Sequence, residues 1–362
     1  MSASRSQGLD FLRGIAIILV MLRHQSINDF SYHIGWIGVD LFFVLSGFLV
    51  AGILFKEQHE TGKTNVGRFL IRRGLKIYPV YYIFYLPYLW IATHPLDLNL
   101  VLADLFFIQN YINGWGYAYP ASWSLAVEEH FYMALALSFM FYCTLSFQIK
   151  KLLSSTRNFI AFCTFIFVAC LLMRISSNTI NPDDFARNQT LTHLRIDSLM
   201  AGVLLAYLHL FHFESLMGFV RKYKLLLGIT SILLLSWTPY LDAQTSVFVR
   251  TWGFTMLYIA FSFVLLLVLS VESNHKPEVT GWWKIFKKQI AKIGIASYSI
   301  YVIHTLVNKV FNSSIKQFDM DLPSWLDFTI TTSASVLLGL LIKKYVEDFF
   351  LRFRDKQFPS RV

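Results

Sequence analysis

Long apolar runs separated by short polar segments make up most of the chain. A helix of about 20 residues crosses a bilayer, and ten runs approach that length. They lie near residues 9–27, 36–55, 77–94, 122–145, 158–176, 191–210, 225–240, 249–270, 290–311 and 326–346. An eleventh run at residues 100–112 is short for a span, so we place it as an interfacial or re-entrant helix. The pattern predicts an all-α, polytopic integral membrane protein, with about ten transmembrane helices in one bundle.

The composition agrees with this pattern. Of the 362 residues, 55% are hydrophobic and only 15% are charged, which is too apolar for a soluble globular protein of ordinary composition. The sequence shows no long linker rich in proline, serine or glycine, no low-complexity tract and no convincing internal repeat. We therefore expect residues 1–362 to form a single membrane domain with no fused soluble domain.

The formal net charge of +10 would suit a nucleic-acid partner, so the location of the charge matters. With the N-terminus inside, about 23 Lys and Arg residues fall in the loops of one side, and only Arg187 and Lys316 fall on the other. Basic loops of this kind remain in the cytoplasm. The bias predicts that both termini are cytoplasmic, and it leaves no reason to expect a nucleic-acid partner.

The three cysteines, Cys143, Cys163 and Cys170, all lie inside apolar runs. Their spacing suits neither a metal site nor a set of extracellular disulfides. We interpret them as buried packing residues and expect no metal. The first apolar run contains an arginine and has no cleavage site made of small residues, so we interpret it as a retained span rather than a signal peptide.

Charged and ionisable residues interrupt the first apolar run. A charge near the bilayer centre costs roughly 2.5–3.5 kcal/mol on insertion scales, and such residues are usually functional. Arg13 and His24 are 11 residues apart, which puts them about 20° from a common helix face and roughly 16 Å apart along the axis. We expect both to point into one groove, with Arg23 directed to the outer interface. A local alternative pairs Arg13 with Asp10 and makes His24 a boundary histidine.

The second run contains Asp40, Ser46 and Gly47. Asp40 lies near the predicted outer end, where it would face either water or a polar groove. Ser46 and Gly47 suit close packing of helices, because small residues let two backbones approach each other.

Four cations precede the third run, namely Arg68, Arg72, Arg73 and Lys76. Inner loops of membrane proteins are basic for topological reasons alone. Four cations at the start of one helix also suit the binding of phosphate groups. The spacing by itself supports both interpretations equally.

The fourth run begins with the adjacent acids Glu128 and Glu129, which cannot share one helix face. At most one of them is expected to face a polar cavity, where His24 would be its partner in the same half of the membrane. In the sixth run, Arg195 and Asp197 suit a local ion pair.

The ninth run carries Tyr301 and His304, which are three residues apart and share a face. A histidine at such a position can be either a structural or a catalytic residue.

Seven segments occur in a fixed order along the chain. They are LRG with the Arg13–His24 pair, GVDLFFVLSGFL (38–49), FLIRRGLKIYP (69–79), WSLAVEEHFY (123–132), RIDSLMAGVLLA (195–206), GIASYSIYVIH (294–304) and VEDFF (346–350). In this order they resemble the acyltransferase family 3 membrane proteins over nearly the whole chain. The resemblance implies an O-acyltransferase of the bacterial inner membrane, which transfers groups other than aminoacyl groups. It would take an acyl group, most often acetyl from acetyl-CoA in the cytoplasm, and deliver it to a hydroxyl of an extracytoplasmic or lipid-linked glycan.

The resemblance also assigns residues. His24 matches the essential histidine of the family, Arg13 its paired arginine and Glu128 its glutamate, and these three form the expected catalytic set. The expected donor-binding residues are Arg72, Arg73 and Lys76, and the expected substrate-binding residues are Trp123, Asp40, Ser46, Tyr301 and His304. Two departures stand out: a lysine replaces the usual third arginine, and the proline that commonly follows the terminal glutamate is absent.

The resemblance implies acetyl-CoA as a co-substrate with no tightly bound cofactor, and a glycan and membrane lipids as partners. In this mechanism His24 acts as a general base with Glu128 orienting its ring, or it carries the acyl group itself. The alternative function is a transporter or flippase of a glycan or lipid-linked intermediate. Such a protein would show inverted repeats and helices broken at Gly or Pro, and the sequence indicates neither.

Overall fold

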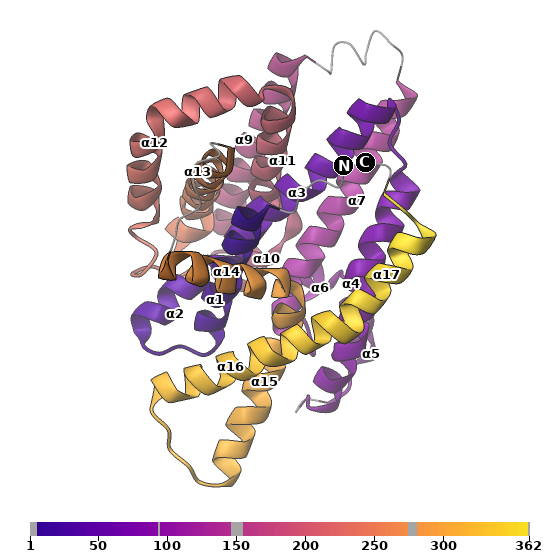
Figure 1. The fold of residues 1–362 in the computed structure, drawn as a ribbon. Helices are drawn as coiled ribbons and strands as arrows, with labels where there is room; N and C mark the ends of the chain where they lie inside the picture. The colour runs from indigo at the N-terminus through magenta and orange to yellow at the C-terminus, as the bar shows by residue number, and fades with distance from the viewer. Residues whose placement is uncertain (1–5, 93–94, 146–154, 274–280, 361–362) are drawn as a thin grey trace.

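The computed structural model describes residues 6–92, 95–145, 155–273 and 281–360. All regular elements in these ranges are helical (Figure 1). The helices are α1 (Gln7–His24), α2 (Asp29–Gly35), α3 (Gly38–Thr61), α4 (Val66–Trp90), α5 (Leu98–Leu105), α6 (Gln109–Ile112), α7 (Trp123–Thr144), α9 (Thr156–Ile180), α10 (Phe185–Thr190), α11 (Ile196–Phe211), α12 (Phe213–Leu235), α13 (Phe254–Ser273), α14 (Trp282–Ile295), α15 (Ser297–Gln317), α16 (Ser324–Ile342) and α17 (Asp348–Gln357). Short 3-10 turns (η1, Pro120–Ser122; η2, Thr192–Leu194) and π-helical turns (η3, Val249–Gly253; η4, Lys343–Glu347) join some of them.

Every one of the ten predicted runs contains a helix, which confirms the all-helical fold within the described ranges. By length and composition, four helical stretches in these ranges can cross a membrane, at residues 29–61, 156–180, 249–273 and 324–357. Two bent pairs of helices would raise that number to six. The count of ten spans and the cytoplasmic position of both termini stay predictions.

One of the two bent pairs departs from the unbroken helices that the sequence indicated. Helices α14 and α15 meet at 76° around Ala296, inside the run predicted at residues 290–311, whereas α11 and α12 meet at 111° on the two sides of His212, between the runs predicted at 191–210 and 225–240. The bend at Ala296 does not occur at a glycine or a proline, which explains why the sequence gave no sign of it. The predicted ninth span is therefore two helices, and α14 lies across α1 (Figure 1).

Helices α3 and α11 are in direct backbone contact at the centre of the bundle. A Cβ atom added to Gly47 would lie 1.9 Å from the carbonyl oxygen of Leu199, and one added to Gly202 would lie 2.2 Å from that of Val44. Any side chain at either position would clash, since real Cβ atoms do not approach other atoms so closely. The packing role expected of Gly47 is confirmed.

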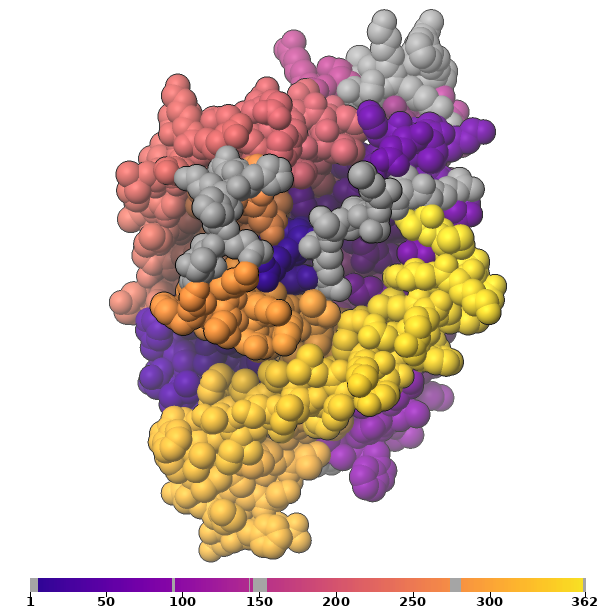
Figure 2. Space-filling view, viewed as in Figure 1, coloured from indigo at the N-terminus to yellow at the C-terminus, as the bar shows by residue number. Residues whose placement is uncertain are grey.

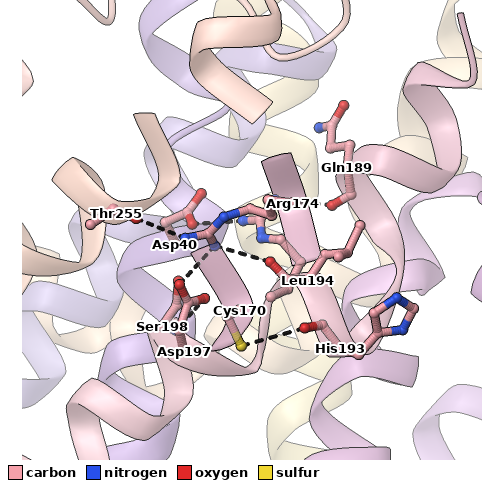
Figure 3. Close-up of polar contacts among 10 residues, drawn as sticks. Asp40, Cys170, Arg174, Gln189, His193, Leu194, Asp197, Ser198 and Thr255 are labelled. Carbon is pink, nitrogen blue, oxygen red and sulfur yellow. Dashed lines mark hydrogen bonds and ion pairs between the residues drawn. The ribbon is translucent and has the colours of Figure 1, made fainter. Parts of the chain in front are cut away.

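Two ion pairs are buried where α3, α9 and α11 meet (Figure 3). Arg195 Nη2 lies 2.6 Å from Asp40 Oδ1, and Arg174 Nη1 lies 2.7 Å from an oxygen of Asp197. The four side chains are at most 1% exposed. The ring of Phe254 covers the Arg195 guanidinium at 3.6 Å, which adds a cation–π contact. The local pair of Arg195 with Asp197 was therefore a wrong prediction, because each residue pairs with a partner on another helix.

The fold also determines the surroundings of Arg23, in the first predicted span, and of the cysteines. Arg23, which was expected to point to the outer interface, instead forms an ion pair with Asp242 at 2.5 Å. Its guanidinium group also lies over the ring of Tyr32. Cys163 and Cys170 are buried free thiols, as predicted. The side chain of Cys143 lies outside the described residues.

Candidate active site

Two adjoining cavities lie in the bundle, the larger between α1, α3, α4, α7 and α15 and the smaller between α3, α4 and α17. The larger, which we name the central chamber, has a volume of about 270 Å³. Its polar lining consists of Arg13, Ser46, Arg73, Lys76, Ser124, Glu128, Tyr132, Ser297, Tyr298 and Tyr301. Along α3 its lining runs from Ile53 to Val39, a distance of roughly 21 Å at 1.5 Å per residue. The central chamber is thus a long, mostly apolar passage with polar groups along its wall.

The smaller cavity, which we name the basic chamber, has a volume of about 170 Å³. Its lining contains five cations and one acid, namely Arg68, Arg72, Arg73, Lys76, Arg354 and Glu57. Ile53, Arg73 and Lys76 line both cavities, so the two chambers adjoin each other at these side chains. The excess of positive charge suits a ligand with several negative charges.

The local sequence explains how α4 contributes four of these cations. The side chain of Asn65 caps the helix by accepting a hydrogen bond of 2.9 Å from the backbone N–H of Arg68. Helix α4 therefore begins before the basic segment, and Arg68, Arg72 and Lys76 follow one another at intervals of four residues. Residues four apart lie on one face of a helix, so the cap and the spacing together collect the cations.

Glu128 lies in the central chamber beside the cations. Its carboxylate accepts a hydrogen bond of 2.8 Å from Tyr132, whose hydroxyl is also 2.6 Å from that of Ser46. Glu129 faces away and accepts a hydrogen bond of 2.8 Å from Tyr78. Only one of the two acids lines the chamber, as predicted. The expected contact between Glu128 and His24 is not formed, because α7 directs this carboxylate toward the basic end of the passage.

The other end of the central chamber is lined by Ser124 and Tyr301, whose hydroxyl oxygens lie 2.6 Å apart. Arg13 lines the passage and also lies 4.0 Å from Asp10, so the local ion pair expected for it is present, whereas His24, which was expected to share its groove, is not among the lining residues. Helices α1 and α15 continue beyond this end, toward His24 and His304.

His24 and His304 face each other one helical turn beyond Tyr301. Their rings meet edge to face with centroids 4.8 Å apart, and His304 Nε2 lies 3.3 Å from His24 Nδ1. His304 is buried, whereas His24 is exposed. Neither histidine is among the residues that line the two chambers, and Tyr301 is the lining residue that precedes His304 on α15 by one helical turn.

Neighbouring carbonyl groups fix the hydrogens on both rings. His24 Nδ1 lies 2.9 Å from the carbonyl oxygen of Val20, and His304 Nδ1 lies 2.6 Å from that of Tyr301. Because a carbonyl oxygen only accepts, both Nδ1 atoms must carry hydrogen. His304 Nε2 is then an acceptor that faces the Nδ1–H of His24. The arrangement leaves a lone pair on His24 Nε2, the nitrogen that a general base requires.

Asp40 and Trp123 belong to neither chamber. Asp40 is held in the buried ion pair with Arg195, and the Trp123 ring packs edge-on against Phe43, 5.5 Å from the Arg195 guanidinium. Both residues surround Arg195 instead of a substrate, so we do not retain them as substrate-binding residues. Ser46, Tyr301 and His304 do lie in or next to the passage.

Several polar residues that line the chambers were absent from the sequence-based set, among them Tyr132 and Arg354. Tyr132 is four residues after Glu128, and that spacing was visible in the sequence. Arg354 joins the basic chamber from α17 near the other end of the chain, and no local pattern indicates its proximity to Arg72. Within the described ranges, no three His, Cys, Asp or Glu side chains form a group that would hold a metal ion.

Comparison with known proteins gives an independent indication of function. A sequence model described as an acyltransferase domain matches residues 6–344. A protein of Staphylococcus aureus (strain MRSA252), provisionally named an O-acetyltransferase, is 28% identical over 98% of this chain and 60% of its own length. The peptidoglycan O-acetyltransferase OatA of Listeria monocytogenes is 26% identical over 97% of this chain and 58% of its own length. The chain thus spans somewhat more than half the length of these relatives. No solved structure matches it.

Proposed function

Since the chain belongs to the acyltransferase domain family, we propose that it is a membrane O-acyltransferase of the bacterial inner membrane. It takes an acyl group, most simply acetyl, from cytoplasmic acyl-CoA and passes it to a hydroxyl of an extracytoplasmic or lipid-linked glycan. The name of the Listeria relative puts peptidoglycan first among the candidate acceptors. The observation that supports the proposal is that the basic chamber adjoins the central chamber, whose far end at Tyr301 lies one helical turn from the histidine pair.

The basic chamber is the proposed site for the phosphates of acyl-CoA. Arginine forks match the geometry of phosphate oxygens, and the chamber offers four guanidinium groups and one ammonium group. Coenzyme A carries its phosphates at one end and its thioester at the end of a long flexible arm. With the phosphates held by Arg72, Arg73 and Lys76, this arm extends into the passage of roughly 21 Å along α3. The charged part of the donor then stays in the cytoplasm.

The proposed chemistry uses the lone pair of His24 Nε2. This nitrogen takes the proton of the acceptor hydroxyl, and the hydroxyl oxygen attacks the thioester carbonyl carbon. The carbon–sulfur bond then breaks, and the thiolate leaves with the proton from His24 to give an ester and free coenzyme A. If the acyl group is first carried on the histidine, the same lone pair attacks the thioester and the thiolate leaves; the acceptor hydroxyl then attacks the acyl group, the bond to Nε2 breaks, and the hydroxyl proton passes to the thiolate. In both routes the Val20 carbonyl and His304 Nε2 both face the Nδ1–H of His24, which leaves Nε2 of His24 free to react.

The remaining chamber residues are assigned to the path of the donor. Arg13 lies along the passage and is proposed to stabilise the amides of the arm or the developing oxyanion. Glu128, together with Ser46 and Tyr132, is proposed to bind the donor near its charged end rather than to orient His24. Tyr301 and Ser124 must separate for the acyl group to reach the histidine pair.

A comparison of surface glycans tests the function and its rival, transport or flipping of a glycan or lipid-linked intermediate. Glycans are analysed by mass spectrometry from cells that lack the protein, express it, or express His24→Ala at the same membrane level. We expect an acyl mass increment only with the intact protein, and its position identifies group and acceptor. His33→Ala is the matched control, because His33 lies in α2 and lines neither chamber. Identical glycans in all cells would reject a glycan acceptor and favour the rival.

A further inference from the structure

We propose that α17 forms part of the donor site, with Arg354 as a further phosphate-binding residue and Asp355 as an internal anion that the donor phosphate displaces. This inference rests on the proposed use of acyl-CoA. It assigns a binding role to a helix that the sequence-based candidates do not include.

The contacts of Asp355 are those of an anion between two arginines. Its Oδ1 atom lies 2.9 Å from Arg72 Nη2 and 2.8 Å from Arg354 Nη2. The same oxygen also accepts from Arg354 Nε at 2.9 Å. One carboxylate oxygen thus bridges two guanidinium groups, which is the arrangement that a phosphate oxygen would adopt between them. Arg72 Nη1 further donates to the backbone carbonyl of Phe358, so the end of the described chain is attached to α4.

The position of α17 fits a site at the membrane surface. The stretch from Ser324 to Gln357 is helical over 34 residues, or about 51 Å at 1.5 Å per residue. The hydrocarbon core of a bilayer is only about 30 Å thick, so one end of this stretch lies outside it unless the helix is strongly tilted. The charged end is α17, which follows α16 diagonally across the molecule (Figures 1 and 2). Arg354 and Asp355 are therefore accessible to a water-soluble donor.

The balance of charge around Arg354 favours an incoming polyanion. The basic chamber has five cations and only Glu57 as an acid in its lining. The Asp355 side chain is 55% exposed, whereas those of Arg72 and Arg354 are 21% and 18% exposed. Ion pairs with an exposed partner contribute little, and Asp355 can turn into water without leaving a buried charge unpaired. A phosphate group with about two negative charges competes well for the same arginines.

The proposal predicts opposite effects for two adjacent residues. Arg354→Gln removes a ligand of the donor and should weaken the binding of coenzyme A about tenfold, the equivalent of one charge-assisted hydrogen bond. Asp355→Asn keeps the size of the side chain, removes the competing anion and should strengthen the binding roughly twofold to fivefold, in line with the weakness of exposed ion pairs. A purely structural role for α17 predicts instead that both substitutions weaken binding, because both loosen the helix from α4.

The experiment measures the dissociation constants of coenzyme A and of 3′-dephospho-coenzyme A for the full chain purified in detergent, by titration calorimetry. Arg352→Gln is the matched control, since it removes the same charge from an exposed position of α17 outside the chamber lining. We expect its dissociation constant to equal that of the unchanged protein. A larger loss for coenzyme A than for the dephospho form would identify the 3′-phosphate as the partner of Arg354, and an equal loss would identify the pyrophosphate.

Each outcome separates the inference from the function on which it rests. If the unchanged protein binds coenzyme A and the Arg354 and Asp355 variants bind it equally well, or both less well, the inference is wrong and the donor assignment stands. If the unchanged protein binds neither nucleotide, the proposed donor itself is wrong. Opposite shifts in the predicted directions, with the Arg352 variant unchanged, would support both.

Discussion

The direction of single hydrogen bonds determines what His24 can do. Two carbonyl oxygens, from Val20 and Tyr301, force hydrogen onto the Nδ1 atoms of His24 and His304. The only ring nitrogen of this pair left with a free lone pair belongs to the exposed His24. In the same way, Arg195 takes its charge partner from another helix and leaves Asp197 to Arg174. The carbonyl partners of the two histidines lie within one helical turn of them, whereas the charge partner of Arg195 comes from another helix.

The orienting role of His304 gives a first prediction. His304→Phe removes the second acceptor that faces the Nδ1–H of His24 and leaves the Val20 carbonyl as the other, so the His24 ring loses part of its alignment, and we expect acyl transfer to fall by about tenfold, the equivalent of one hydrogen bond. His24→Ala removes the base itself and should cost more, within the 10²- to 10⁴-fold range of general bases. Transfer rates in reconstituted vesicles measure both effects. His304→Gln, whose amide oxygen can accept the same hydrogen bond, should recover part of the rate; equal loss with Phe and Gln would contradict an orienting role.

The buried pair of Asp40 and Arg195 gives a second prediction, for stability. Asp40→Ala leaves the Arg195 guanidinium buried without its carboxylate, and breaking a buried pair costs about 3–5 kcal/mol. We expect a strongly lowered melting temperature in detergent and a reduced yield of monodisperse protein. Glu60→Ala is the control, because the exposed pair of Glu60 with Lys56 contributes less than about 1 kcal/mol. If Asp40→Ala lost activity at an unchanged melting temperature, Asp40 would return to the set of substrate-binding residues.

The helices position the site by close packing and by bends. The glycine contact between α3 and α11 brings these helices together, and α3 provides one wall of the central chamber. The cap at Asn65 starts α4 early enough to make its basic residues helical. The break at Ala296 separates α14 from α15, and α15 then brings Tyr301 and His304 to α7 and α1.

The glycine contact gives a third prediction. Gly47→Ala puts a methyl group 1.9 Å from the Leu199 carbonyl oxygen, so α3 and α11 must move apart, and overpacking of this kind costs about 1–3 kcal/mol. We expect a lower melting temperature together with lower transfer activity. Gly52→Ala is the control on the same helix, because no atom lies within 4 Å of its added Cβ. Alanine at that position should be neutral or slightly stabilising, and equal behaviour of the two variants would contradict the packing argument.

The molecule as a whole must separate two chemical environments. The basic chamber has to open to the cytoplasm and His24 to the other side if a cytoplasmic donor is to reach an external acceptor. The distribution of Lys and Arg among the loops predicts this orientation. The cations of α4 and α17, which come from two of these predicted inner segments, lie together in one chamber.

Orientation gives a fourth prediction, tested by labelling with a membrane-impermeant maleimide. Lys63 and Lys316 are both exposed, and the predicted topology puts them on opposite sides. Lys316→Cys should react in intact spheroplasts, whereas Lys63→Cys should react only after the membrane is opened. The unchanged protein measures the background from its own cysteines, of which Cys163 and Cys170 are buried. The reverse pattern would invert the topology, and labelling of both in intact cells would contradict the odd number of spans between them.

The sequence alone was sufficient for features that depend on short separations along the chain. The ten helical segments, the collection of cations on α4 and the buried state of two cysteines follow from hydrophobic patterning and from the helical repeat. The order of the motifs identified the family, which the match over residues 6–344 confirmed. Backbone hydrogen bonds within a helix set these relations, so they do not depend on how the helices later pack.

Only the tertiary structure decided which side chains meet. The His24–His304 contact joins residues 280 positions apart, the Arg195–Asp40 pair joins residues 155 apart, and the Arg72–Phe358 contact spans 286. The first pair depends on the bend at Ala296, the second on the packing of α3 against α11, and the third on the way α17 returns to α4. Glu128 illustrates the limit, because its helix was predicted correctly while its expected partner was not. A local pattern fixes the face of a helix on which a residue lies, but the packing of distant helices fixes what that face touches.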